Sequence, residues 1–413
     1  MRTDGESIVN YIKKTAAEEG IDKHVQFHHK LQAADWSSDA QCWTLSVKAD
    51  GADKKMTAKF LLHASGYYDY ENALPSKING IENFKGTVVH PQFWPSDMDY
   101  TGKRIVIIGS GATAVTLLPN LAKTATHVTM LQRSPGYVMA RPAIDPLGAL
   151  LKRFLPIWVA HKLIRLQFLV LPFIFFNFCR AFPNASRNVI RKATLKQLPK
   201  NVPHDPHFMP SYNPWEQRMC LSPDGDFYEA LREGKTSVVT GKIADMTANS
   251  IKLESGETIE ADIIVTATGL KMQMAGGAVM SVDHEPVKIS EKFLWKGVML
   301  QDLPNAAFVI GYTNASWTLG ADATAQLVTR LLNTMKRDGT TAAVPRLEDP
   351  ASLKEMPVLN LNSTYITAGS AQGALPKAGD SGVWRPRRNY FTDIYNAKYG
   401  DINTGLQFYR VST

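Results

Sequence analysis

Cysteine is scarce in this sequence of 413 residues, which contains only three. Cys42, Cys179 and Cys220 stand far apart, so they form neither a CxxC redox pair nor the spacing of a metal site. No metal is therefore predicted, and a reducing compartment is expected. Residues 1–20 lack the apolar stretch of a signal peptide, which makes the cytoplasm the expected location.

Blocks of like charge are also missing. The net charge of +8 comes from scattered Lys and Arg residues, and no nucleic-acid-binding motif accompanies them. Nucleic acid is therefore not expected as a partner. A basic soluble enzyme with anionic cofactors fits the composition best.

A charge-free apolar run, residues 166–179, lies between Arg165 and Arg180. It is shorter than the about 20 residues that a spanning helix needs, and it contains Pro172. A buried or dimer-facing helix pair fits it best. A helix in the membrane interface and a spanning helix stay open, so peripheral contact with the inner face of the membrane is kept as a prediction and the oligomeric state is left open.

The order of patterns along the chain is typical of an α/β protein. We expect a helix over residues 5–19 and then a small antiparallel β-meander over residues 24–68, where apolar and polar residues alternate. A complete βαβ unit is predicted at 103–134 and a helical insertion at 145–214. From 226 onward, the pattern returns to alternating strands and helices.

The βαβ unit contains a match to GxGxxG/A between its first strand and its helix. In this motif, the first Gly permits a tight turn, the second lets backbone amides approach a pyrophosphate, and the small third residue lets the helix pack on the strand. The context makes the match specific and predicts a dinucleotide site. Its residues are Gly109, Ser110, Gly111, Ala112, Thr113 and Ala114.

The end of the second strand of this unit indicates which dinucleotide binds. NAD sites place Asp or Glu there for the ribose hydroxyls, whereas this chain has Gln132, Arg133 and Ser134. An Arg suits a 2′-phosphate, so NADPH is the predicted coenzyme. The alternative is that Arg133 is only a solvated surface charge.

Four residues upstream of this unit have a fixed spacing: Phe84, Gly86, His90 and Trp94. The pattern FxGxxxHxxxW, followed by Pro95, resembles the fingerprint of Baeyer–Villiger monooxygenases, which are class B members of the flavin-containing monooxygenase family. Segments from HVTMLQRSP to LPKAGDSGVWRPRRNYFTDI resemble the ethionamide-activating type, so the likeness covers nearly the whole chain. In that family, the fingerprint links the FAD-binding and NADPH-binding domains.

The resemblance implies an α/β fold, a Rossmann-like FAD/NAD(P)-binding flavoprotein with two domains and three ββα layers. Residues 1–95, with the meander and linker, and residues 266–413 would form the FAD-binding domain. Residues 96–265 would form the inserted NADPH-binding domain, which carries the helical insertion.

The resemblance also implies an activity. The family uses NADPH and FAD to transfer one oxygen atom of O2, through a C4a-peroxyflavin, into a ketone or onto sulfur or nitrogen. Arg218 matches the arginine that stabilises the peroxyflavin anion and contacts the nicotinamide, a task that suits a permanent cation. The alternative is that Arg218 only pairs with Glu216 or a backbone carbonyl.

Other cofactor contacts are implied on either side of the NADPH-binding domain. Gly66 and Gly269 match turns at strand ends where the chain crosses between domains, and we expect both to permit close backbone approach. Asn314, Ser316 and Trp317 match a segment that flanks the flavin, although Trp317 fits a core position equally well.

One part of the family pattern has no counterpart in the sequence, namely the first strand, GxGxxG loop and helix that hold the ADP half of FAD. The chain therefore resembles a member that lacks the N-terminal part of its FAD-binding domain. We expect the apolar residues 60–62 and 263–265 to be exposed as a result. A catalytically impaired NADP(H)-binding remnant or pseudoenzyme stays open as the alternative to an active enzyme.

Overall fold

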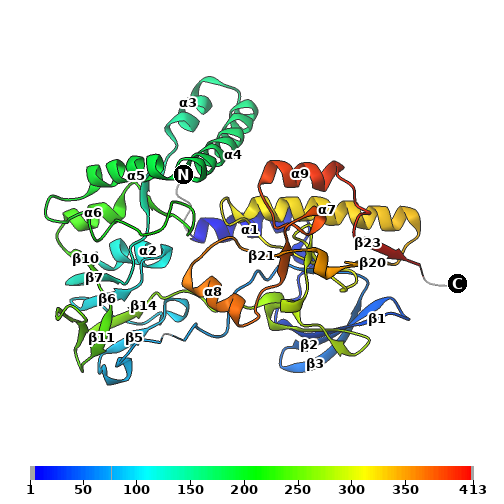
Figure 1. Cartoon of the computed structure of the whole chain (residues 1–413), viewed down its shortest axis with the longest axis horizontal. Helices are drawn as coiled ribbons and strands as arrows, with labels where there is room; N and C mark the ends of the chain where they lie inside the picture. Colours follow the sequence, from blue (N-terminus) through cyan, green and yellow to red (C-terminus); the bar gives the residue numbers. More distant parts are fainter. Residues whose placement is uncertain (1–4, 76, 411–413) are drawn as a thin grey trace. The chain divides into compact units, whose positions relative to one another are not determined.

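The structure is a computed structural model that describes residues 5–75 and 77–410. The chain forms two compact units (Figure 1). Residues 72–270 make the first unit, and residues 5–71 and 271–410 make the second. The first unit therefore interrupts the sequence of the second.

The first unit is built on a five-stranded parallel sheet in the order β10-β7-β6-β14-β5. Its central strands β6 and β14 are buried apolar runs, as is typical of a parallel sheet with both faces covered. The predicted βαβ unit is present as β6, α2 and β7. The bounds are β5 Thr87–Val89, β6 Arg104–Ile108, α2 Ala112–Leu121, β7 His127–Gln132, α6 Asp226–Arg232, β10 Thr236–Thr240 and β14 Ile263–Thr266.

Strand β5 lies in the stretch of residues 84–95, which is too irregular in sequence for a strand to be expected there. It forms because its three residues pair in parallel with β14, from Thr87 opposite Ile263 to Val89 opposite Val265. Residues 72–95 therefore lie with the first unit, upstream of the predicted division at 95. The predicted exposure of residues 263–265 is wrong, because β14 lies between β6 and β5 and is buried.

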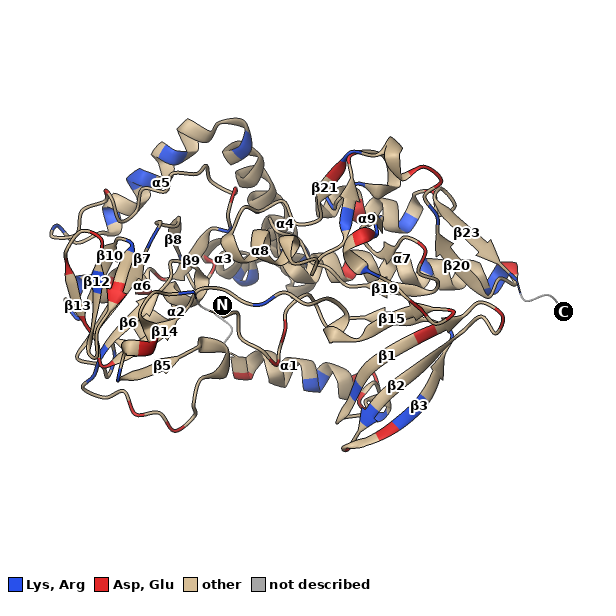
Figure 2. Cartoon of the chain, turned by 60° about the horizontal axis from the view of Figure 1, so that its bottom comes forward, with Lys and Arg blue, Asp and Glu red and all other residues tan. Residues whose placement is uncertain are grey.

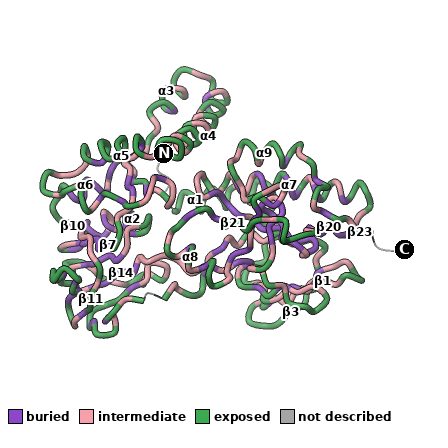
Figure 3. Tube along the Cα trace, viewed as in Figure 1, coloured by how far each residue is buried: buried purple, intermediate pink, exposed green. Residues whose placement is uncertain are grey.

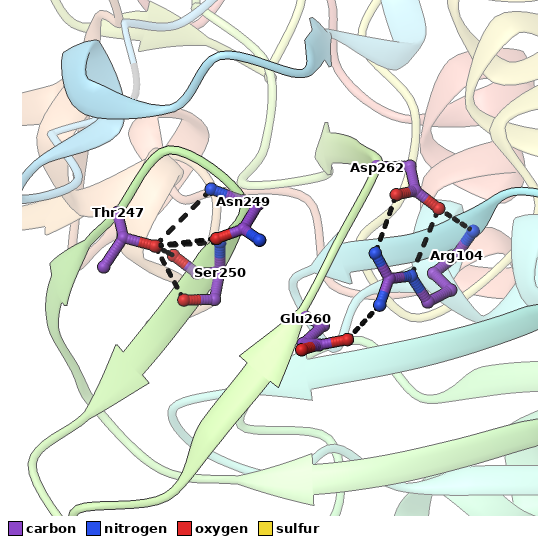
Figure 4. Close-up of polar contacts among 6 residues, drawn as sticks. All are labelled: Arg104, Thr247, Asn249, Ser250, Glu260 and Asp262. Atoms are coloured by element: carbon purple, nitrogen blue, oxygen red, sulfur yellow. Dashed lines mark hydrogen bonds and ion pairs between the residues drawn. The ribbon is translucent and has the colours of Figure 1, made fainter.

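A small antiparallel sheet packs beside the parallel one, with the order β11-β12-β13. Figure 4 shows polar contacts of this region: Thr247 Oγ1 contacts Ser250 Oγ at 2.7 Å, which stabilises the turn between β11 and β12. Nearby, Arg104 donates to both carboxylate oxygens of Asp262 and pairs with Glu260. The bounds are β11 Ile243–Met246, β12 Ser250–Leu253 and β13 Thr258–Glu260.

Three helices make up the insertion: α3 (Pro146–Phe154), α4 (Ile157–Ala181) and α5 (Pro183–Gln197). Asp145 caps α3 by accepting a hydrogen bond from the amide of Gly148 at 2.9 Å. The insertion was predicted over residues 145–214, and its helices end at Gln197. Residues 198–214 contain no helix, because five prolines interrupt the segment from 199 onward.

Helix α4 is longer and more exposed than the apolar run suggested. Among the described residues it is the one helix that is long and apolar enough to cross a membrane, and only 6% of its most apolar window is buried. Within one chain, α4 is therefore not a buried helix. Strand β8 (Val138–Arg141), which precedes the insertion, pairs in parallel with β9 (Cys220–Pro223), which follows it, and β8 also contacts α5.

The second unit holds the predicted β-meander, which is confirmed as three antiparallel strands, β1 to β3. Two later strands extend it to a sheet in the order β16-β15-β1-β2-β3. Trp36 and Trp43 pack edge to face in its core, with ring centroids 5.5 Å apart. The bounds are α1 Gly5–Glu18, β1 His29–Ser37, β2 Cys42–Ala49, β3 Ala52–Ala58, β15 Val279–Val282 and β16 Glu285–Pro286.

A second sheet of this unit has the order β17-β18-β19-β4, with β4 at its edge. Residues 60–62 were predicted to be exposed. Leu62 in β4 is half exposed, in agreement with this prediction, whereas Phe60 is partly buried and packs against the core. The bounds are β4 Leu61–His63, β17 Leu294–Trp295, β18 Met299–Leu300, β19 Ala306–Phe308, α7 Trp317–Asp338, β20 Ala342–Pro345, β21 Glu355–Pro357, α8 Thr364–Ala371, β22 Lys377–Gly379, α9 Tyr390–Tyr399 and β23 Leu406–Tyr409.

Candidate functional site

The turn after β6 requires glycine at position 109. Its φ of 141° lies where side chains are strained, and a Cβ added there would stand 2.3 Å from the carbonyl oxygen of Ala267. The amide of Gly109 donates to the carbonyl of Leu131 at 2.8 Å. Strand β6, its neighbours and the turn are thus locked together by backbone contacts.

The start of α2 is open, in contrast to the crowded turn at Gly109 that precedes it. A Cβ on Gly111 would meet no atom within 4 Å, and Ala112 and Thr113 are exposed. Ala114, by contrast, is fully buried against the sheet. The first turn of α2 therefore presents backbone amides and the positive end of the helix dipole to a space that an anionic group can enter.

The carboxyl end of β7 lies next to this loop. Ser110 Oγ donates to the carbonyl of Ser134 at 2.8 Å, which ties the two segments together. Gln132 is buried, and its amide donates to the carbonyl of His207 at 2.7 Å and to Thr240 at 3.0 Å. Arg133 and Ser134 are exposed, so they are the residues of this trio that a ligand can reach directly.

The fingerprint segment is fixed by packing. Phe84 is buried, and a Cβ on Gly86 would stand 2.4 Å from the carbonyl oxygen of Asp262, so only glycine fits. Trp94 packs edge to face on Tyr100 at 6.1 Å. Phe84 and Trp94 thus pack on the clusters that cover the parallel sheet, and Gly86 lies against the residue before β14.

His90 connects the fingerprint to a second predicted site residue. Its Nδ1 accepts from the amide of Gln92 at 3.3 Å, which leaves the proton on Nε2, and Nε2 contacts the carbonyl oxygen of Gly269 at 3.4 Å. Gly269 has a φ of 112°, which favours glycine. The structure therefore brings together His90 and Gly269, which are far apart in sequence.

Arg218 is exposed and lies between an isolated bridge at Pro214 and strand β9. The carboxylate of Glu216 accepts from the backbone and side-chain amides of Asn213 at 3.0 and 2.9 Å. These bonds, with Arg180 and Arg187 nearby, lower the pKa of Glu216. The main hydrogen-bond donors to the Glu216 carboxylate are therefore the two amides of Asn213.

Cys220 was not predicted as part of the site, yet its thiol lies beneath the Gly-rich loop, 3.9 Å from the carbonyl oxygen of Ser110. Burial raises its pKa to about 11. The thiol is thus protonated at neutral pH and has a packing role, not a nucleophilic one. Nothing in its sequence spacing could have indicated this.

In the second unit, Gly66 follows β4 in a turn with a φ of 71°. The nearest atom to an added Cβ is Tyr70 Oη at 3.7 Å, which is ordinary contact. The turn therefore favours glycine for its backbone angle, and it leaves space beside Gly66. Asn314 is half-buried, and its amide lies 3.5 Å from the carbonyl of Arg388.

Ser316 is exposed and precedes α7, whereas Trp317 is partly buried and packs against the core of the unit. The Trp317 ring contacts that of Tyr67 at 4.8 Å. A Cβ on Gly311 would stand 2.3 Å from it. These contacts agree with a packing role for Trp317.

Two residues at the carboxyl end of β4 were missed by the sequence interpretation. His63 stacks on Phe308 at 4.8 Å, and burial lowers the pKa of His63 to about 4. His63 Nε2 and Ser65 Oγ are buried and have no hydrogen-bond partner among the described residues. Buried polar atoms are rarely left so, and ligands of α/β sheets bind at the carboxyl ends of strands.

The chain is similar to known flavin-dependent proteins in sequence and in fold. The model of the family described as flavin-binding monooxygenase-like matches residues 3–163. FAD-containing monooxygenase EthA of Mycolicibacterium smegmatis is 43% identical over 401 residues, which cover 97% of this chain and 81% of that protein. The chain belongs to the flavin-binding monooxygenase-like family. Probable FAD-binding monooxygenase AlmA of Acinetobacter sp is 39% identical over 411 residues, which cover 98% of this chain and 82% of that protein.

A solved structure of oxidized steroid monooxygenase bound to NADP aligns with this family member at a TM-score of 0.72 and 19% identity, over 98% of this chain and 85% of that one. At this identity the likeness shows the fold, and it confirms the predicted Rossmann-like FAD/NAD(P)-binding α/β class. The relatives confirm the predicted flavin monooxygenase family and enzyme class, and they favour an enzyme over the pseudoenzyme alternative.

The described residues of this flavin-binding monooxygenase-like chain fit both coenzymes. The open start of α2 beside Gly111 fits a pyrophosphate, as NADPH requires. The orphaned buried atoms of His63 and Ser65 fit polar groups of a bound flavin nucleotide in the second unit.

Proposed function

We propose that this enzyme uses NADPH and FAD to insert one oxygen atom from O2 into ketones, in a Baeyer–Villiger oxidation, or onto sulfur or nitrogen. The observation that supports it most strongly is the loop at Gly109 to Ala114, a preformed pyrophosphate cradle in a chain whose relatives are named FAD-containing monooxygenases. Its partners are a small-molecule substrate and O2.

Residues of the first unit would hold NADPH. The amides after Gly111 would accept the pyrophosphate, and the guanidinium of Arg133 would bind the 2′-phosphate. Ser134 would keep its place through Ser110, and Gln132 would act indirectly by holding the strand end from which Arg133 projects.

Arg218 would be the catalytic residue. Bound FAD, once reduced, supplies the activation of O2, and the protein supplies positioning and electrostatics. The permanent positive charge of Arg218 would favour negative charge that develops beside it, since a guanidinium stays protonated at every working pH. His63, Ser65, Gly66 and Asn314 would hold the flavin nucleotide.

The contact between His90 and Gly269 supports a positioning role for the fingerprint. With its proton on Nε2, His90 would hold the strand-end turn at Gly269 to the linker and would take no part in proton transfer.

The test is turnover of the FAD-loaded chain with NADPH, a simple ketone and 18O2. The proposal expects one labelled oxygen atom in the ester product and NADPH consumed in equal amount. Arg218→Ala should lower kcat by at least about a hundredfold while NADPH affinity stays within about threefold. NADPH oxidation without labelled product in the wild-type protein would contradict the proposal.

We also propose that the protein acts in the cytoplasm and contacts the inner face of the membrane peripherally. The exposure of apolar side chains on α3 and α4 supports this contact.

A further inference from the structure

The helical hairpin formed by α3 and α4 exposes an unusual amount of apolar surface. Figure 3 shows these helices almost without buried residues, and Ala160 and Cys179 are the buried positions of α4. A helix that is apolar on all sides normally lies in a core or in a membrane. The exposed large apolar side chains are Leu147, Leu150, Phe154, Ile157, Trp158, Leu163, Leu166, Phe168, Leu171, Phe173 and Ile174.

Both ends of the hairpin continue into the first unit, because β8 precedes α3 and α5 follows α4. Gln167 Nε2 donates to Asp145 Oδ1 at 3.1 Å, which joins the middle of α4 to the start of α3. Beyond Ala181, α5 buries Ile190 and Thr194 in the same unit. At about 1.5 Å per residue, the part of α4 before Gln167 reaches roughly 15 Å past this link, far less than the roughly 30 Å of a hydrocarbon core.

The charges of the insertion all have one sign. Residues 146–204 contain no Asp or Glu, and Figure 2 shows Lys and Arg along α5 without an acidic residue. Such a surface is complementary to anionic lipid headgroups. Its basic residues are Lys152, Arg153, Lys162, Arg165, Arg180, Arg187, Arg191, Lys192, Lys196 and Lys200.

The tip of the hairpin, residues 150–163, combines both features. Phe154 is 70% exposed and Trp158 is 62% exposed. Arg153 lies over the ring of Phe154 at 5.6 Å, and Lys162 lies over that of Trp158 at 5.1 Å. Aromatic rings with cationic heads beside them suit the boundary between headgroups and acyl chains, where the ring is buried and the charge stays at the phosphates.

We propose that the tip of the α3–α4 hairpin inserts into the headgroup region of a bilayer that contains anionic lipids, and that it holds the protein on that surface. The inference rests on the peripheral membrane contact proposed above and is independent of the oxygenation chemistry. The expected depth, about 5 to 10 Å, is within the reach of the tip.

The test is flotation of the 413-residue chain with vesicles of phosphatidylcholine alone or of phosphatidylcholine mixed with phosphatidylglycerol. The wild type should float with the mixed vesicles and should be released by high salt. The double variants Phe154→Ser/Trp158→Ser and Arg153→Glu/Lys162→Glu should each lower the partition coefficient by at least about tenfold. As a matched control, Tyr395→Ser/Tyr399→Ser removes exposed rings from α9 and should float like the wild type.

Folding of each variant is checked by its circular dichroism spectrum and Tm. As a second readout, Trp158 fluorescence, obtained as the difference from Trp158→Phe, should shift to the blue on adding mixed vesicles. Equal flotation with both lipids, no flotation of the wild type, or unchanged flotation of the hairpin variants would overturn the inference. So would a wild-type dimer in sedimentation velocity that Phe154→Ser/Trp158→Ser dissolves, because a second copy would then cover the tip.

These results separate this inference from the proposed function. A chain that oxygenates ketones but does not float loses only the membrane proposal. A chain that floats but gives no oxygenated product keeps the membrane proposal and loses the proposed activity.

Discussion

The strand ends that carry the predicted cofactor residues differ between the two units. In the first unit, the polar groups around the Gly109 turn find partners within the unit, as Ser110 does on Ser134 and Gln132 on His207. In the second, β4 forms the edge of its sheet, and His63 Nε2 and Ser65 Oγ lack partners among the described residues. The comparison teaches that polar groups of the first site are already partnered within the unit, whereas the second leaves two buried polar atoms available to a ligand.

The largest expected effect is the loss of NADPH affinity on replacing the glycine of the first turn, compared with the glycine of the second. Gly109→Ala would force a Cβ against Ala267 at a strained φ, so NADPH affinity should fall by about a hundredfold or more and the Tm of the first unit should drop. Gly66→Ala is the matched control, because its added Cβ has room and only the backbone angle opposes it, at about 1 kcal/mol. Isothermal titration calorimetry and thermal unfolding measure both. Equal NADPH affinity in the two variants would contradict the preformed cradle.

Coenzyme choice is the next test of the first unit. Arg133→Ala should weaken NADPH binding by about tenfold and leave NADH binding unchanged, because only NADPH carries the 2′-phosphate. Lys235→Ala is the control. Lys235 is exposed and precedes β10, so it lies at the amino ends of the parallel strands, whereas the loop lies at their carboxyl ends. A similar loss for both coenzymes would show that Arg133 acts only through general charge.

The second unit should be sensitive to mild acid because of His63. Burial holds its folded pKa at about 4, below the ordinary 6.5, so its contribution to stability is complete above about pH 6.5 and declines as the pH falls toward 4. Between about pH 6.5 and about pH 5 the loss should be about 2 kcal/mol. His63→Phe keeps the stacking on Phe308 and should remove this dependence in calorimetric scans. An unchanged pH dependence in that variant would refute the assignment.

The smallest expected effect lies in the first unit, at Asp262. The side-chain hydrogen bonds from Arg104, followed by its backbone amide, lower the pKa of Asp262 to about 2. The stabilisation is present above the unfolded value of 3.8 and is lost as the pH falls from there to about 2. Because the pair is partly exposed, Asp262→Asn should lower the unfolding free energy by only about 1 kcal/mol at neutral pH. Glu260→Gln, at a more exposed position, should change it less, and denaturant titration measures both.

Local sequence patterns predicted the fold class and the Gly-rich loop because the turn, helix and flanking strands depend on neighbouring residues. They missed β5, since its hydrogen bonds come from β14, far along the chain. They also missed His63, Ser65 and Cys220, because their roles depend on burial by distant segments. The exposure of α4 could not be read from its composition, since an apolar helix in a core has the same sequence pattern.

The central claim is that the phosphates of NADPH bind at the loop from Gly109 to Ala114. Hydrogen exchange of the FAD-loaded protein, followed by mass spectrometry with and without NADPH, tests it most directly. The account predicts slower exchange in the peptide that covers residues 109–115, and no such slowing in Gly109→Ala. Unchanged exchange in this peptide, with protection by NADPH elsewhere in the first unit, would contradict it.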